Sequence, residues 1–418
     1  MKPIFFTVFF LWGFGIVASG QELTLDECLA KAQATHPLSK NQRQIDEITA
    51  LKLRSLQSQY YPQFDLTGQI SWQNDVTHMT AASMPITVPT APKDQYKAYV
   101  DVRQVIYDGG TTLSSKKLEQ ARNQADQRSL QVELYQVENG VIQSYFLVLA
   151  IDKQLEQLKY SLGDLDARLK ESQVKIQSGW MLQSQADLFE VEILRLKQRE
   201  ISLTEARKAS LATLEEYTGT PLAGDVVLGL PAKTETPGTP QRPELALYDA
   251  QKTQLEASKE TLDASRMPKL SAFGQMGYGN PGYNMLADEF DTFYMVGLRL
   301  NWNIWDWHKA RNDKQALSLQ QQMVDQRQEN LLRQIRVQRL DIGSRIANLE
   351  QSLAMDEKIV TLRQNITKTA LSQLDNGVIT AADYVARLNE EAIARLSADL
   401  HHVELAKAEA ELAFVMGR

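Results

Sequence analysis

The sequence predicts a mainly α-helical fold with a smaller β-segment, and it predicts that this arrangement occurs twice along the chain of 418 residues. Three kinds of segment support the prediction: alternating apolar–polar strands that begin just after a proline, alternating strands that return, and long proline-free stretches with coiled-coil spacing. Pro62 and Pro268 are 206 positions apart. The same separation relates Gly68 to Gly274. A separation that stays constant over several elements indicates an internal duplication.

The first twenty residues have the features of a cleaved secretory signal peptide. A basic start at Lys2 precedes an apolar run over residues 4–17, and the small residues Ala18 and Gly20 lie at −3 and −1 from the expected cleavage point. This order of charge, apolar run and small residues is typical of export signals. We therefore exclude residues 1–20 from the fold and expect the mature chain to be exported.

The composition argues against a nucleic-acid partner and against a disulfide-stabilised fold. The net charge is −7 and the charges are scattered, whereas binding to nucleic acid needs a basic stripe. Cys28 is the only cysteine, so an internal disulfide cannot form. An exported chain of this length must then be held together by packing or by oligomerisation.

The alternating strands define the β-segment. We expect them at about 63–73 and 95–107 in the first copy and at about 269–279 and 292–305 in the second. Each has one apolar face and about the length that a tilted strand needs to cross a bilayer. A soluble β-sandwich is the alternative, but the sequence offers no further strand-rich region for its second sheet. Aromatic residues that we expect at the membrane interface mark the strand ends: Tyr61, Trp72, Tyr278, Trp302 and Trp305.

A long helical segment follows each return strand. Prolines are absent between Pro92 and Pro221 and after Pro281. Leucines in the first segment and isoleucines and leucines in the second are spaced by three and four residues, as in a coiled coil. Each segment contains one glycine break, at Gly179 and at Gly377, and these glycines are 198 positions apart. Since glycine favours the end of a helix, each segment is predicted to be a helical hairpin.

These elements divide the mature chain into two repeats and a linker. The first repeat covers residues 21–219, with a leading helix, two strands and a helical hairpin. A proline-rich linker covers 220–242, and the second repeat covers 243–418 with the same order of elements. Four strands leave two unpaired edges, which hydrocarbon cannot satisfy, and the smallest membrane barrels have eight strands. We therefore expect an oligomeric β-barrel that the helical hairpins extend as a second tube.

The whole mature chain resembles the TolC-like family of outer-membrane efflux proteins. The resemblance is carried by "LTLDECLAKAQATHP" at the mature start, the two P-x-x-x-x-x-G-Q strand beginnings, "VIYDGG", the glycine-marked hairpin tips and the duplicated layout. It implies a homotrimer, with a twelve-stranded barrel in the outer membrane and a long α-helical barrel in the periplasm. It also implies a passive channel in a tripartite export system, with a periplasmic adaptor and an inner-membrane pump as partners.

The resemblance further implies that the periplasmic helix tips close the channel. On that basis the candidate tip and pore-constriction residues are Gly179, Asp187, Gly377 and Asp383. The match is incomplete, because Ala386, Leu374 and Ile379 stand where the family pattern has an aspartate, a tyrosine and a basic residue, and Asp187 matches only with a two-residue insertion. The alternative for Asp383 is a carboxylate at a helix N-terminus, where the helix dipole favours it.

Two other classes of protein were weighed against an outer-membrane channel. A periplasmic coiled-coil scaffold or adaptor without a pore would explain the heptads but not the four amphipathic strands. A secreted enzyme would need convergent polar residues, and the sequence contains no H-E-x-x-H, P-loop or G-x-S-x-G motif. We therefore expect no catalytic, cofactor-binding or metal-binding residues, no cofactor and no enzymatic activity.

Overall fold

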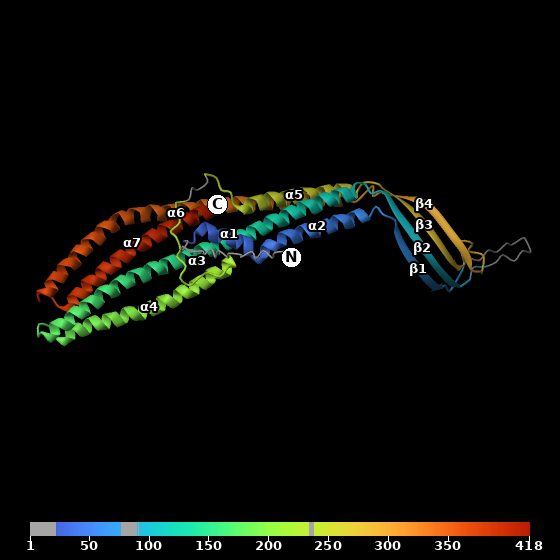
Figure 1. Ribbon diagram of the computed structural model, residues 1–418. Coiled ribbons are helices and arrows are strands. Elements are labelled where there is room, and N and C mark those ends of the chain that lie inside the picture. The colour runs from blue at the N-terminus through green and yellow to red at the C-terminus, as the bar shows by residue number, and fades with distance from the viewer. Residues whose placement is uncertain (1–21, 77–89, 91, 234–237) are drawn as a thin grey trace, which may run out of the picture. The chain divides into compact units, whose positions relative to one another are not determined.

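The computed structural model describes residues 22–76, 90, 92–233 and 238–418, and the expected signal peptide lies outside them (Figure 1). The chain forms two compact units. One contains the segments up to Ser39, Leu134–Gln241 and Ile335–Arg418, and the other contains Lys40–Glu133 and Arg242–Gln334. Each unit takes segments from both halves of the chain, so the compact units are not the two sequence repeats.

The unit that contains the sheet is built from helices and strands of both repeats, together with the first parts of two long helices that continue into the other unit. Its elements are α2 (Asn41–Ser58), β1 (Gln63–Trp72), β2 (Asp94–Tyr107), α5 (Pro243–Ser265), β3 (Lys269–Asn280), β4 (Asp291–Asn301) and the first parts of α3 (Thr111–Gln177) and α6 (Lys309–Asp375).

The four strands form one antiparallel sheet in the order β1-β2-β3-β4 (Figure 1). β1 pairs with β2 from Gln63–Arg103 to Trp72–Asp94, and β3 pairs with β4 in the same way. Three of the expected strands lie within a residue or so of their predicted bounds. The fourth was predicted too long, because β4 ends at Asn301, where its pairing with Lys269 of β3 also ends.

Matched aspartates begin the two long helices. Asp108 Oδ2 accepts a hydrogen bond of 2.6 Å from the backbone N–H of Thr112, and Asp306 Oδ2 accepts one of 3.1 Å from that of Ala310. Both bonds join a carboxylate to the amide four residues further on, and they occupy free donors of the first helical turn. The two aspartates are 198 positions apart, so the duplication extends to how the helices are capped.

The residues after these aspartates share a left-handed backbone but differ in side chain. Gly109 and Gly110 have φ of +70° and +83°, and their counterparts Trp307 and His308 have φ of +54° and +65°. A residue with a Cβ atom pays about 1–2 kcal/mol for this conformation, whereas glycine adopts it freely. The second repeat therefore keeps a strained backbone at the junction where the first repeat uses glycine.

Replacing His308 with glycine should remove this strain. For His308→Gly we expect the free energy of unfolding in detergent to rise by about 1 kcal/mol, as followed by denaturant titration. Gly110→Ala is the matched reverse change, because a Cβ added at Gly110 meets nothing within 4 Å and only the backbone conformation is affected. It should lower stability by a similar amount. A destabilising His308→Gly would show that side-chain contacts of the histidine outweigh the strain.

The helical unit contains two hairpins and the short helices at its side. Its elements are α1 (Leu25–Thr35), α4 (Gln183–Thr218), α7 (Ala381–Met416) and the later parts of α3 and α6, and the 3-10 helix η1 (Pro37–Lys40) follows α1. The bounds of α6 and α7 are those of α3 and α4 shifted by 198 residues. Both hairpins therefore have the same helix lengths. Among the described residues, no helix is both long and apolar enough to cross a membrane.

One of the two apolar cores of this unit ties the mature N-terminus and the linker to α3. Cys28, Val141 and Tyr145 are buried there. The Tyr145 hydroxyl lies 2.8 Å from the carbonyl oxygen of Leu23 and 2.6 Å from that of Gly229. Leu23 also forms a parallel bridge with Leu228. The one hydroxyl hydrogen is thus shared between two carbonyl oxygens from distant parts of the chain, and the Leu23 carbonyl also accepts the N–H of Gly229 at 3.2 Å.

Removing the Tyr145 hydroxyl should destabilise this unit without creating a large cavity. Tyr145→Phe removes the hydroxyl shared by these two carbonyl oxygens and leaves that of Gly229 without its donor, which costs about 1–3 kcal/mol of unfolding free energy. The measurement is the midpoint of denaturant unfolding, with the exposed Tyr160 on the same helix as the control in Tyr160→Phe. Equal midpoints for the two variants would contradict the role given to Tyr145.

Candidate functional site

One face of the sheet is apolar, and in the described part of the chain most of its residues are exposed. Alternation along each strand and the pairing across strands place the following residues on it: Phe64, Leu66, Gly68, Ile70, Trp72, Tyr96, Ala98, Val100, Val102, Leu270, Ala272, Gly274, Met276, Tyr278, Thr292, Tyr294, Val296, Leu298 and Leu300. The side chains of Leu66, Ile70 and Tyr294 are each 80% exposed. A contiguous apolar surface of this size requires an apolar surrounding.

The predicted interface aromatics lie at both ends of this face. Tyr61 precedes β1, and Trp302 and Trp305 follow β4, so these three are at the end where the sheet joins the helices. Trp72 and Tyr278 are at the opposite end, next to the loops, and all five side chains are exposed. The chain from Tyr61 to Trp72 extends about 36 Å, or about 25 Å when tilted by 45°, which matches the apolar band of membrane strands.

The opposite face of the sheet is polar. On β2, a carboxylate oxygen of Asp101 lies 3.9 Å from a guanidinium nitrogen of Arg103. On β4, Cζ of Arg299 lies 5.0 Å from the centroid of the Phe273 ring. The charged residues of this face therefore have both signs. A face of this kind suits contact with water, and the two faces together match a sheet that separates lipid from an aqueous space.

An aromatic group on the polar face was not predicted from the sequence. Tyr283, from the loop between β3 and β4, packs edge-to-face on Phe293 with ring centroids 4.8 Å apart. Its hydroxyl donates a 2.9 Å hydrogen bond to Gln275. Gly277 makes room for the Phe293 ring, because a Cβ there would lie 2.7 Å from Cζ of Phe293. The loop therefore folds over the polar face, which no local sequence signal indicated.

The predicted tip glycines occupy the turns of the two hairpins. Gly179 and Gly377 have φ of +78° and +72° and follow α3 and α6. In each turn two backbone hydrogen bonds return to the last helical turn: those from Trp180 to Lys175 and from Val378 to Gln373 are both 2.8 Å. This is the Schellman arrangement, in which a left-handed residue ends the helix. The structure places both glycines where the sequence predicted the reversals.

The predicted tip aspartates lie on different helices, each with a local partner. Asp187 on α4 accepts a 2.9 Å hydrogen bond from Gln183. Asp383 is the third residue of α7, where it forms a capping box with Thr380: Asp383 Oδ2 accepts from the Thr380 hydroxyl at 2.7 Å and from its N–H at 3.1 Å. None of the described contacts joins the two aspartates. Asp383 thus has the helix N-terminal position that was weighed as its alternative.

The electrostatics of Asp383 follow from this capping box. Hydrogen bonds from the hydroxyl and N–H of Thr380 hold the pKa of Asp383 below its ordinary value of 3.8. Since the folded pKa is depressed, the stabilisation is complete at neutral pH and is lost as the pH falls through the folded pKa. Asp383 is exposed and also borders a groove of about 560 Å³ with Gln373 and Arg387. The capping role therefore leaves a negative charge available at the tip.

Contacts between the hairpins were missed by the sequence reasoning. At the tips, Lys175 of α3 and Asp375 of α6 form an ion pair of 2.8 Å. Above the tips, Asn389 of α7 donates a 3.2 Å hydrogen bond to Glu192 of α4. The ion pair is partly exposed, and such pairs contribute about 0–1 kcal/mol, so it can break at small cost.

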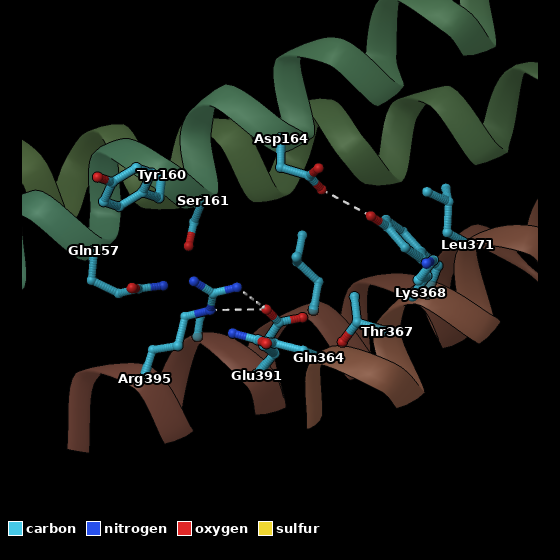
Figure 2. A pocket seen from close by; sticks show the side chains of 13 residues that line it. Gln157, Tyr160, Ser161, Asp164, Gln364, Thr367, Lys368, Leu371, Glu391 and Arg395 are labelled. Carbon is cyan, nitrogen blue, oxygen red and sulfur yellow. Dashed lines mark hydrogen bonds and ion pairs between the residues drawn. The ribbon is translucent and has the colours of Figure 1, made fainter. Parts of the chain in front are cut away.

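A polar cavity of about 420 Å³ lies between α3 of the first hairpin and α6 and α7 of the second (Figure 2). The Tyr384 hydroxyl donates a hydrogen bond of 2.8 Å to Asp164. Figure 2 shows Asp164 at one side of the cavity and the ion pair of Arg395 with Glu391 at the other. The Tyr384 ring is buried and packs edge-to-face on Phe189, with centroids 6.4 Å apart. The two contacts of Tyr384, with Asp164 of α3 and Phe189 of α4, join the hairpins along the cavity, whereas the ion pair of Arg395 with Glu391 lies within α7.

Solved structures with this fold are outer-membrane channels. CusC, whose structures concern transmembrane channel formation, superposes with a TM-score of 0.71 at 12% identity over 94% of this chain and 92% of its own. The CmeC outer membrane channel of Campylobacter jejuni gives 0.67 at 14% identity over 94% and 85%. The MtrE outer membrane channel of Neisseria gonorrhoeae, in an open state, gives 0.67 at 13% identity over 94% and 88%.

These similarities establish the fold of the chain over nearly its whole length. No protein-family model and no curated protein sequence matches it. The expected mainly α-helical fold with a four-stranded sheet is confirmed, and the resemblance to TolC-like channels drawn from the sequence is confirmed as one of fold. The chain has the fold of these outer-membrane channels.

Removing the capping hydroxyl of Thr380 should loosen the start of α7. Thr380→Ala deletes the acceptor for the N–H of Asp383, and a lost N-cap costs about 1 kcal/mol. Hydrogen exchange of the amides in the first turn of α7 should then be about fivefold faster. Leu182→Ala is the matched control, because Leu182 is the N-cap of α4 and makes no side-chain capping bond. Equal acceleration in both variants would contradict the assignment.

Proposed function

We propose that this chain is the outer-membrane channel of a tripartite export system and acts as a passive conduit. The single observation that carries the proposal is the exposed apolar face of the four-stranded sheet, backed by a polar face with charges of both signs. Such a sheet belongs between lipid and water. The fold is that of channels, and the proposed function includes no chemical step.

The proposed assembly is a homotrimer whose strands close into one barrel. A four-stranded sheet has two edges with unpaired backbone groups, and lipid offers them no hydrogen-bonding partner. Three copies would supply twelve strands and remove every edge. The apolar face would contact outer-membrane lipid, and the polar face would line the pore. The aromatic residues Tyr61, Trp72, Tyr278, Trp302 and Trp305 would lie at the two lipid–water interfaces.

The helical hairpins would form the periplasmic part, with an adaptor and an inner-membrane pump as partners. The tip residues Gly179, Asp187, Gly377 and Asp383 are proposed to line the constriction. The ion pair of Lys175 with Asp375, which contributes little stability, is one contact that opening would break. A coiled-coil scaffold without a pore would leave the apolar face of the sheet in water, so the structure favours the channel.

Single-channel conductance in planar bilayers tests this function. Purified wild-type protein should give discrete openings from an oligomer that only detergent extracts from membranes. In Asp383→Ala, block by divalent cations should weaken, because a ring of carboxylates at the tip is lost. Asp26→Ala is the matched control, since Asp26 is also an exposed carboxylate in the first turn of a helix, α1.

Two results would count against the proposal. A detergent-free, soluble monomer without openings would contradict the channel itself. Openings whose divalent block is the same in wild type, Asp383→Ala and Asp26→Ala would leave the channel intact and remove Asp383 from its constriction.

A further inference from the structure

The duplication in this chain is repeated in the pairing of its strands. Within the first repeat, Gly68 pairs with Ala98. Adding 206 to the first number and 198 to the second gives Gly274 and Val296, which also pair. The same rule converts every pair of β1 with β2 into a pair of β3 with β4. The two separations read from the sequence thus describe a structural repeat at the level of individual residues.

Helix contacts beside the sheet obey the same rule. Gln127 of α3 donates a 2.7 Å hydrogen bond to Asp46 of α2. The corresponding residues of the second repeat, Asp325 and Lys252, form an ion pair of 3.3 Å. The chemistry differs but the positions in contact are the same. The repeat rule therefore holds for side chains as well as for strands.

Pairing between β2 and β3 joins the return strand of one repeat to the leading strand of the next. Its counterpart is the pairing of β4 with β1 of a second copy, since β4 is the return strand of the last repeat and β1 the leading strand of the first. This step rests on the proposed function, in which copies of the chain close a barrel. Exposed apolar edge strands of this length favour such pairing.

We propose that β4 pairs with β1 of a partner subunit in the register set by β2 and β3. Asp101 pairs with Gln275, and the rule converts this pair into Arg299 opposite Gln69 of the partner subunit. In the same way Val100 with Met276 becomes Leu298 opposite Ile70 of the partner subunit.

The proposed register matches the two faces of the sheet without adjustment. Leu298 and Ile70 of the partner subunit are both on the apolar face, and Arg299 and Gln69 of the partner subunit are both on the polar face. A slip of one residue would place every apolar side chain of one strand opposite polar ones. Both separations are even numbers, so the rule keeps each residue on its own face and the proposed register is consistent with the alternation of both strands.

The same register explains why β4 is shorter than β2. β2 has 14 residues and β4 has 11. Pairing of β2 with β1 ends at Arg103, and the last residues of β2 pair with β3 alone, through a bulge between Val105 and Tyr107. Their counterparts are residues 302–305, which include the exposed Trp302 and Trp305. We infer that this segment becomes the end of β4 when β1 of the partner subunit lies beside it.

The rule that adds 206 and 198 does not hold for contacts at the junction between the strands and the helices. A Cβ at Gly109 would lie 2.6 Å from that of Met267, and the counterparts of these residues are Trp307 and Tyr61 of the partner subunit. Trp307 does carry a Cβ, so this contact must be wider between copies than within one. The strands, rather than the junction, therefore provide the pairs to be tested.

Disulfide cross-linking tests the register, with the chain itself supplying the control. The double variant Gln69→Cys with Arg299→Cys should form disulfides between copies under an added oxidant, giving dimer and trimer bands that disappear on reduction. Asp101→Cys with Gln275→Cys is its counterpart within one chain and should form an intrachain disulfide. The native thiol of Cys28 is buried and burial raises its pKa to about 11, so it stays protonated and silent.

Register-shifted pairs decide the outcome. Thr67→Cys or Ser71→Cys, each combined with Arg299→Cys, would place the cysteines on a diagonal about 7–8 Å apart, too far for a disulfide without backbone movement. Cross-linking by a shifted pair and not by Gln69→Cys with Arg299→Cys would overturn the register while leaving the channel in place. A third result would overturn both the register and the channel. In it, Asp101→Cys with Gln275→Cys forms its intrachain disulfide, no cysteine pair links two copies, and the protein is a soluble monomer.

Discussion

The rest of the structure depends on a sheet that cannot exist alone in lipid or in water. Its apolar face would be exposed in water, and its two edges would carry unpaired backbone groups in lipid. In the proposed function, a closed ring of strands from several copies would satisfy both demands. In that assembly the duplication would serve closure, because the two similar halves present a return strand and a leading strand at opposite edges, and these are the two kinds of strand that already pair inside the chain.

The duplication also extends through the helical unit, where the two hairpins share their helix bounds but differ in side chains. α3 with α4 and α6 with α7 have the same lengths, and left-handed glycines end the first helix of each hairpin. Contacts that distinguish the halves include a capping box at Thr380 without a counterpart at Leu182, and strained Trp307 and His308 where the first half has Gly109 and Gly110. These asymmetric positions are where function specific to this protein is expected to lie.

Most of the fold could be predicted from the sequence because its signals are local and occur twice. Proline before each leading strand, period-two alternation, and glycine at Gly179 and Gly377 each specify a backbone conformation directly. The features that could not be predicted depend on distant partners. The end of β4 depends on a neighbouring strand, the fold of the Tyr283 loop depends on Phe293 and Gln275, and the role of Asp383 depends on whether its carboxylate turns toward Thr380 or toward the pore. Alternation alone cannot decide any of these.

The most direct test of the central claim is an accessibility scan of β1 in lipid vesicles. Spin labels are attached one at a time at residues 63–72, and collisions with oxygen, which concentrates in lipid, are compared with collisions with a water-soluble nickel complex. The account predicts a period of two, with labels at Leu66 and Ile70 reporting lipid and labels at Thr67 and Gln69 reporting water. Uniform exposure to the nickel complex along the strand would contradict it.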